Sequence, residues 1–260
     1  MSEPNYESKW WGYIYDQMMT QHLHDVIDNH LHFYQTNLRH VTGPVLDCAC
    51  GTGLFLLPLL AAGHDMHGFD ISTSMLTRLK TKAEAQGVVD IDRRISIQDF
   101  VSFRYHQLFE AIIIPTNTFL MLTTQAAQIT TLKNIHAHLA SGGKLLLDLR
   151  LAGMRSLVES PAVVRGRWHT WRHPETGRAI RQRIDGRVDF NHQLTLDRCF
   201  IEYEVEREEF PMTGRWMFKE EFQLLLRLAG FACWASFGSS TGDQLDLGSD
   251  EQQSYWIVDK

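Results

Sequence analysis

The residues best suited to bind a ligand lie between positions 44 and 53, in the run PVLDCACGTG. Three positions of this run, Ala49, Gly51 and Gly53, carry little or no side chain. A ligand can therefore approach the backbone closely and reach the N–H groups that open a following helix. Asp47 has the wrong charge to hold a phosphate but suits a cationic ammonium group or its bound waters. The run predicts a site for a nucleotide-like ligand and differs from a phosphate-binding loop.

The elements around this run predict a strand, a helix and a second strand in succession. Residues 45–46 are typical of a buried central strand, and the apolar residues 54–62 predict a helix. The next strand ends at Asp70, and a helix is predicted over residues 72–85. A carboxylate at the carboxyl end of a parallel strand lies where open α/β sheets bind ligands. Helix capping is the alternative role for Asp70, because aspartate is a good N-cap.

The sequence VLDCACGTG, followed by Asp70 at the end of HDMHGFD, resembles the first two motifs of the class I S-adenosylmethionine-dependent methyltransferases. The resemblance, to members that act on small molecules, implies that the loop holds the methionine part of the cofactor and that Asp70 accepts the ribose hydroxyls. It also implies S-adenosylhomocysteine as the product. Ala49 stands where the family usually has its first glycine. Strand–glycine–helix turns also occur in other α/β proteins, so the motif alone is weak evidence.

The same resemblance implies cofactor contacts on other elements. Asp99, after a strand at residues 95–97, is expected to accept from the adenine amino group, and Phe100 to cover the ring. Tyr15, in the pair Tyr15-Asp16, is expected to lie over the methionine end as part of a lid. The complete expected set of cofactor-binding residues is Tyr15, Asp47, Ala49, Gly51, Gly53, Asp70, Ile71, Met75, Asp99, Phe100, Pro115 and Thr116.

The remaining pattern predicts an α/β fold. A continuous apolar strand at 109–114, a helix at 125–139 and a strand at 144–148 continue the alternation of strand and helix that is typical of a parallel, doubly wound sheet. Alternating apolar residues after position 153 predict an antiparallel meander, and a helix at 219–229 precedes strands at 231–236 and 254–258. The resemblance implies seven strands, mostly parallel, with the last one antiparallel.

These elements are expected to form one methyltransferase domain over residues 1–260. Its parts are an N-terminal helical cap or lid (1–40), the cofactor-binding core (41–150), an antiparallel β insertion after strand five (153–215), and the last helix and strands of the core (216–260). Ten arginines and nine acidic residues lie between Arg165 and Arg215, a local balance of +1. This mixture predicts a solvated sheet face rather than an anion-binding surface.

Composition restricts the class of partner and the compartment. The net charge of −6 and the pI near 6.1 argue against binding to nucleic acid through phosphate contacts. The four cysteines have no C-x-x-C spacing, which favours reduced thiols in a cytoplasmic protein. No apolar stretch is long enough for a membrane span. We expect a monomer or homodimer, no metal, and solvated positions for the histidines of residues 22–32.

The expected reaction is an in-line transfer of a methyl group to an oxygen or nitrogen atom of a small molecule, without a metal. The chain lacks the Asn/Asp-Pro-Pro-Tyr/Phe motif of enzymes that methylate adenine or glutamine amides. Candidate bases are Tyr15, His22, His169 and His192, and no spacing selects among them. A non-catalytic cofactor sensor or partner subunit is the main alternative. A dinucleotide oxidoreductase is disfavoured because Ala49, Gly51 and Leu54 do not form G-x-G-x-x-G.

Overall fold

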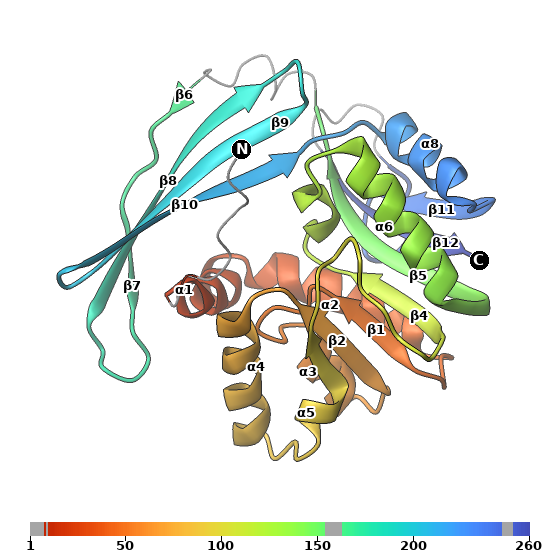
Figure 1. The fold of residues 1–260 in the computed structure, drawn as a ribbon, viewed down its shortest axis with the longest axis horizontal. Coiled ribbons are helices and arrows are strands. Elements are labelled where there is room, and N and C mark those ends of the chain that lie inside the picture. Colours follow the sequence, from red (N-terminus) through yellow and green to blue (C-terminus); the bar gives the residue numbers. More distant parts are fainter. Residues whose placement is uncertain (1–7, 9, 154–162, 246–251) are drawn as a thin grey trace.

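The computed structural model describes residues 8, 10–153, 163–245 and 252–260 of the chain. Its main sheet has seven strands in the order β11-β12-β5-β4-β1-β2-β3 (Figure 1). Their bounds are β1 Val45–Cys48, β2 Met66–Asp70, β3 Ile95–Ile97, β4 Phe109–Ile114, β5 Leu139–Leu151, β11 Cys233–Phe237 and β12 Gln252–Asp259. Strands β1 to β5 pair in parallel, whereas β12 runs antiparallel to both β5 and β11. The expected sheet is confirmed, including its reversed last strand.

Helices cover both faces of this sheet because the central strands are apolar on both sides. In β4, Ile112 and Ile114 pack on one face in a cluster with residues of α6 and α8. Ala111 and Ile113 point the other way, into a cluster with residues of α2, α3 and α4. The helices concerned are α2 His24–Leu38, α3 Leu56–Ala61, α4 Thr73–Ala85, α6 Gln125–His138 and α8 Lys219–Ala229, with the short α5 Ile91–Arg94 and 3-10 helix η2 Thr118–Met121 between strands.

The N-terminal cap is helical, as expected, but it is divided. Helix α1 (Trp11–Gln17) continues into a π-helical turn, η1 (Met18–His22), and α2 begins only after Leu23. Leu23 has φ −121°, which lies outside the helical range and separates the two helices. Because of this break, α1 and α2 pack on different neighbours: α2 lies on the main sheet and α1 contacts the second sheet.

The residues after β5 form the predicted antiparallel insertion. Its sheet has the order β10-β9-β8-β6, with β7 also paired to β8. The strands are β6 Val163–Val164, β7 His169–Arg172, β8 Ala179–Asp189, β9 Leu194–Tyr203 and β10 Glu206–Arg215. Figure 1 shows α1 between this sheet and α4. A third apolar cluster joins them, with Trp10, Trp11 and Ile14 packed against Ile201, Tyr203 and Phe210.

The expectation of a mixed, solvated sheet face is wrong for Arg215. Its side chain is 4% exposed and donates to Glu221 and Gln193, both at 2.6 Å, and to Gln128 at 3.2 Å. Arg215 ends β10 where the insertion meets α6 and α8. A count of the charged residues could not predict which arginine is buried there. The guanidinium therefore joins the insertion to the core.

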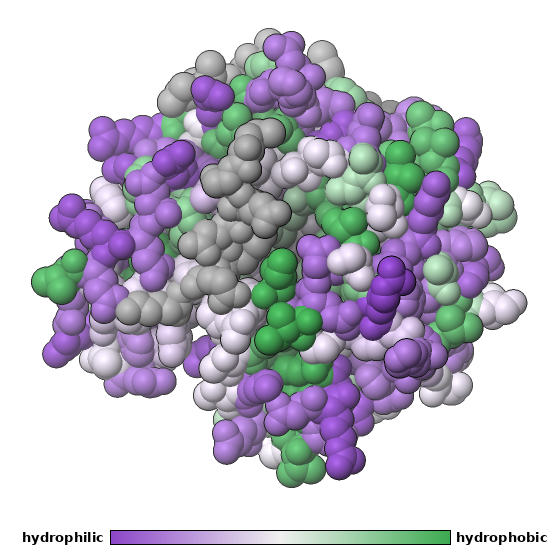
Figure 2. All heavy atoms as spheres, in the orientation of Figure 1, coloured by the Kyte–Doolittle hydropathy of each residue, from purple (hydrophilic) through white to green (hydrophobic). Residues whose placement is uncertain are grey.

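The visible surface is mainly polar. On the face shown in Figure 2, apolar side chains occur in small groups between hydrophilic ones wherever described residues are seen. None of the helices in the described part of the chain has the length and apolar character needed to cross a membrane.

Candidate active site

The loop after β1 owes its shape to three residues in left-handed backbone conformations. Ala49 has φ 56°, Gly51 φ 51° and Gly53 φ 77°. Glycine adopts this conformation freely, whereas for alanine it costs about 1–2 kcal/mol. At Gly53 a Cβ atom would lie 2.8 Å from Leu79 Cγ, so no side chain fits there. Gly53 therefore allows the loop to pack against α4, and Ala49 keeps the left-handed turn despite its methyl group.

Asp70 fixes this loop from the end of β2. Its Oδ2 atom accepts from Gly51 N at 2.8 Å and its Oδ1 atom from Ser72 N at 2.8 Å. The N-cap of α4 is Ser72, whose hydroxyl accepts from Met75 N at 3.3 Å. Asp70 thus sets the geometry of the glycine loop, while Ser72 provides the side-chain cap of α4.

Six of the expected cofactor residues converge on one small cavity. It is lined by Tyr15, Asp47, Ala49, Cys50, Gly51, Leu54, Phe55, Pro115 and Thr116. Its volume is about 20 Å³, room for about one water molecule. Cys50, Leu54 and Phe55 were not predicted as lining residues, although all three belong to or adjoin the motif.

The other six expected residues do not line the cavity. Ile71 is 47% exposed, and Asp99 is exposed at the end of β3, where its Oδ1 atom accepts from Val101 N and Ser102 N. Phe100 packs on Phe69, with ring centroids 6.2 Å apart. The remaining three are Gly53, Asp70 and Met75, which are placed around the loop and on α4. The structure assembles the expected methionine end of the site, whereas Ile71 and Asp99 stay at the surface.

Asp47 is the strongest indication of a cationic ligand. Its side chain is 1% exposed, and its Oδ1 atom has no hydrogen-bond partner among the described residues. Burial, together with the nearby Asp70 carboxylate, raises the pKa of Asp47 well above its ordinary range. Buried ionised carboxylates are normally paired, so a positive group in the cavity would complete this site. The residues present therefore fit the ammonium and sulfonium charges of S-adenosylmethionine.

The cap is held down by Asp16, next to Tyr15. The Asp16 carboxylate accepts from Thr52 Oγ1 at 2.6 Å in the glycine loop, from Arg78 Nε at 3.1 Å and from Lys82 Nζ at 3.0 Å on α4. Tyr15 Oη lies 3.5 Å from Thr116 Oγ1, across the cavity. Burial raises the pKa of Tyr15 to about 12, so at neutral pH this phenol keeps its proton and does not act as a base.

We expect Asp16→Ala to loosen the cap and speed the release of S-adenosylhomocysteine about tenfold, because hydrogen bonds to a charged group contribute about 1.5–3 kcal/mol each. Stopped-flow fluorescence of ligand displacement measures this rate. The matched control is Asp92→Ala, which removes an exposed ion pair to Lys80 on the same helix α4. Equal release rates in the two variants would contradict the role of Asp16.

Asp148 is a buried carboxylate with four hydrogen-bond donors around it, a role that the sequence did not indicate. Its carboxylate is fully buried at the end of β5 and accepts from Tyr34 Oη at 2.7 Å, Thr116 N and Asn117 N at 2.9 Å, and Gln253 Nε2 at 3.1 Å. Thr116 and Asn117 both have positive φ, a strained conformation for residues with side chains. Asp148 therefore holds the loop after β4 in place beside the cavity. Its position at the carboxyl end of a strand was the available signal.

The histidines that were candidate bases do not line the cavity. His22 and His169 are exposed, and His22 lies edge-on to Trp171 at 5.1 Å. His192 is exposed and paired with Asp189 at 2.9 Å. His22, His24 and His32 are solvated as expected, but His30 is buried, contrary to the expectation. Among the described residues no three His, Cys, Asp or Glu side chains are grouped so as to hold a metal ion.

A seven-stranded sheet with a reversed β12, a glycine loop after β1 and an acid at the end of β2 define the class I methyltransferase fold. Residues 45–143 match the methyltransferase domain family. Residues 45–143 are therefore similar to a methyltransferase domain, and the chain has the fold of the S-adenosylmethionine-dependent methyltransferases. This confirms the resemblance in the sequence, and S-adenosylmethionine is the cofactor of this class.

Individual proteins show how far the similarity extends. The cypemycin N-terminal methyltransferase of a Streptomyces species is 26% identical over 214 residues, which cover 80% of each chain. An S-adenosylmethionine-dependent methyltransferase of Clostridium acetobutylicum superposes with a TM-score of 0.72 at 17% identity, over 95% of this chain and 97% of that one. The sugar N-methyltransferase KedS8 of a Streptoalloteichus species gives a TM-score of 0.68 at 15% identity, over 95% and 92%.

Proposed function

We propose that this protein transfers a methyl group from S-adenosylmethionine to the nitrogen atom of a small-molecule acceptor, without a metal. The observation that carries the proposal is the buried, incompletely paired Asp47 carboxylate in a cavity lined by five other residues expected to contact the cofactor. A neutral or anionic ligand would supply no positive charge to balance the ionised form of that carboxylate. The preference for nitrogen over oxygen is supported by the names of the similar N-terminal and sugar N-methyltransferases.

When bound, S-adenosylmethionine supplies a methyl group on a positively charged sulfur atom. Asp47 balances positive charge in the cavity, and the glycine loop offers backbone N–H groups to the rest of the ligand. Tyr15 and the cap, which Asp16 binds to the glycine loop and α4, exclude water from the reacting atoms. Alignment of two reactants in this way can lower a barrier by about 7–11 kcal/mol, so no covalent intermediate with the protein is needed.

Binding and turnover separate this proposal from its alternatives. Calorimetry with S-adenosylmethionine, S-adenosylhomocysteine and NAD is expected to give saturable binding for the first two only. Methyl-labelled cofactor is then incubated with the protein and a fraction of small metabolites. Label in small molecules supports the proposal, and label confined to intact macromolecules contradicts it. Binding of S-adenosylmethionine without methyl transfer to any fraction would favour a sensor or partner subunit. Binding of NAD alone would favour an oxidoreductase.

We expect Asp70→Ala to weaken the binding of S-adenosylhomocysteine by a factor of ten or more, since hydrogen bonds that a carboxylate accepts contribute about 1.5–3 kcal/mol. The substitution removes both the expected ribose acceptor and the acceptor for Gly51 N, which holds the loop. Calorimetry measures the affinity, and circular dichroism checks the fold. Asp28→Ala, an exposed position on α2, is the control. Parent-like affinity in Asp70→Ala would refute the ribose assignment.

A further inference from the structure

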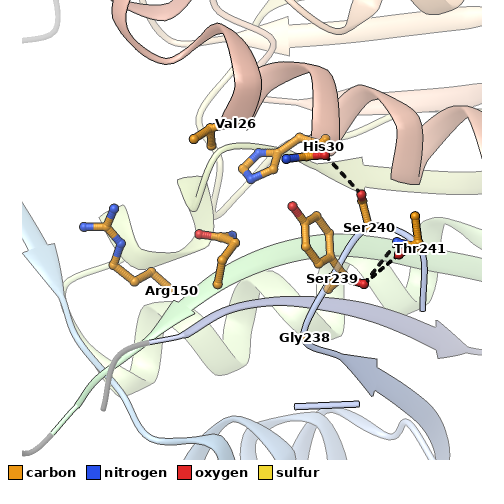
Figure 3. Close-up of a pocket in the computed structure, with 10 residues that line it drawn as sticks. Val26, His30, Arg150, Gly238, Ser239, Ser240 and Thr241 are labelled. Carbon is orange, nitrogen blue, oxygen red and sulfur yellow. Dashed lines mark hydrogen bonds between the residues drawn. The ribbon is translucent and has the colours of Figure 1, made fainter. Parts of the chain in front are cut away.

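A second, larger pocket lies at the carboxyl ends of β5 and β11, on the edge where such sheets bind ligands. It has a volume of about 480 Å³, which is in the range of small-molecule sites. In Figure 3, Arg150 lies at one side of the pocket and the loop that carries Ser239, Ser240 and Thr241 at the other. The rest of the lining is Val26, Asn29 and His30 of α2, Gly238, and Gln253 and Tyr255 of β12.

This pocket is separate from the cofactor cavity. Phe55 lines the cavity, and its ring is stacked on that of His30, which lines the larger pocket, with centroids 6.4 Å apart. Both ring nitrogens of His30 are buried, so they offer no hydrogen bond to a ligand. The buried Asp148 carboxylate lies in the same wall and accepts from Tyr34 and Gln253. A molecule in the larger pocket therefore cannot receive a methyl group from the cavity, and the pocket needs another role.

Tyr255 is a buried residue of this lining with unused hydrogen-bonding capacity. It is only 4% exposed, and its hydroxyl has no hydrogen-bond partner in the described part of the chain. Burial and the nearby Asp148 carboxylate raise the pKa of this phenol to about 12, so at neutral pH it keeps its proton and remains a donor. A polar group buried without a partner costs free energy, and a ligand that accepts a hydrogen bond from Tyr255 would recover it.

The hydroxyl groups of the loop after β11 are already used as donors. Ser239 and Thr241 donate to Asp243 Oδ2 at 2.7 and 3.1 Å. Ser240 Oγ donates to Asn29 Oδ1 at 3.5 Å, and this contact appears as a dashed line in Figure 3. The Asn29 amide accepts through its oxygen, so its Nδ2 group is left to donate to a ligand.

The lining carries positive but no negative charge. Arg150, near the end of β5, is the one described lining residue with a permanent charge, and no described carboxylate lines the pocket. Asp148 lies behind the lining, fully buried and surrounded by four donors. A guanidinium, the phenol of Tyr255 and the amide of Asn29 all donate, which suits a carboxylate because its two oxygens only accept.

We propose that the larger pocket is a second ligand site, separate from the site of methyl transfer, and that it binds a small molecule through a carboxylate group. The carboxylate accepts from Arg150, from the hydroxyl of Tyr255 and from the amide of Asn29. The volume leaves room for several further atoms beside the carboxylate. Because the wall separates this ligand from the cofactor cavity, it is bound without being methylated.

The first test is calorimetry of the full chain with two matched pairs of probes, succinate with succinamide and hippurate with its amide, hippuramide. At least one carboxylate is expected to bind saturably, and its uncharged partner at least tenfold more weakly, because hydrogen bonds to an ionised acceptor are stronger than neutral ones. If neither carboxylate binds, or if the amides bind as tightly, the inference is overturned.

The second test locates the bound carboxylate. Tyr255→Phe removes only a hydroxyl that has no partner in the free protein, so we expect the melting temperature to be retained and the affinity for the carboxylate to fall about tenfold. Asn29→Ala, at an exposed position of α2, is also expected to weaken binding. Its control is Asn37→Ala, on the same helix but outside the pocket, where the amide donates to Phe33 O. Parent-like affinity in both Tyr255→Phe and Asn29→Ala would overturn the inference.

The third test separates this site from the site of methyl transfer. The probe that binds is incubated with the protein and methyl-labelled S-adenosylmethionine, and it is expected to remain unlabelled. Label on a probe whose affinity depends on Tyr255 would overturn the separation of the two sites. The proposed function fails independently, because binding of the carboxylate does not require S-adenosylmethionine.

Discussion

Arg215→Met is expected to lower the free energy of unfolding by about 1–3 kcal/mol, because it leaves the partly buried Glu221 carboxylate and the Gln193 and Gln128 side chains without their donor. Arg215 and Glu221 approach to 2.6 Å with side chains only 4% and 18% exposed, and Gln193 and Gln128 complete the network. Methionine keeps most of the side-chain volume, so the loss reports on charge and hydrogen bonds rather than on packing. Chemical denaturation of the parent and the variant measures the difference.

The double variant Arg215→Met/Glu221→Leu is the control for this result. Removal of both charges avoids an unpaired, partly buried carboxylate, so the double variant is expected to be more stable than Arg215→Met alone. A double variant that is less stable than Arg215→Met would contradict the explanation.

Acid is expected to weaken the same network. Burial alone would raise the pKa of Glu221, but hydrogen bonds from Arg215, Gln193 and Gln125 bring it below its ordinary value. A carboxyl whose pKa is lowered by folding contributes stability above its unfolded pKa of about 4.3, and this contribution disappears as the pH falls through the folded pKa.

Asp47→Asn is expected to have opposite effects on stability and on cofactor binding. The pKa of Asp47 is raised by folding, so the free protein loses stability as the pH rises above about 3.9, and a neutral asparagine does not carry this cost. We therefore expect a higher melting temperature, by about 2–4 °C for each kcal/mol gained. Affinity for S-adenosylmethionine should fall by a factor of ten or more, as a charge-assisted contact is lost.

Differential scanning fluorimetry without ligand and calorimetry with ligand measure the two effects. Asp25→Asn, an 87% exposed carboxylate on α2, is the control and is expected to change neither quantity. Unchanged affinity in Asp47→Asn would show that Asp47 does not balance the charge of the cofactor.

The core of the fold was predictable because its signals are local. The apolar run at 109–114 is followed closely by turn residues, and the observed β4 has the same bounds. The strand predicted at 45–46 is also observed, and β1 continues through Asp47 to Cys48. The helix predicted at 72–85 is observed as Thr73–Ala85, with its cap at Ser72. Strand β5 extends back to Leu139, through residues expected as a turn, because its first residues pair with β4 around a register shift.

The features that were missed depend on residues distant in the sequence. Asp148 appeared only as the end of a strand, yet its four partners lie on α2, the loop after β4 and β12. His30 has helical spacing on an apolar face, but its relation to Asp148 exists only in the folded chain. The net charge of residues 165–215 counts the buried Arg215 in the same way as its solvated neighbours, so it could not single out this residue. Spacing predicts elements well, but not which polar side chains they bury together.

The contacts of α1 have a consequence for the order in which the protein is completed during synthesis. Trp10 packs on Tyr203 with centroids 4.3 Å apart, and Trp11 lies 5.9 Å from Phe210, so the first helix needs partners from β9 and β10. A ribosome-bound chain can form the β1–α3–β2 unit early, but α1 lacks this surface until residues near 210 have emerged. Contacts this distant in sequence form late because the intervening chain must first be ordered. We therefore expect the N-terminal segment that carries Tyr15 to reach its final position only after the insertion has folded.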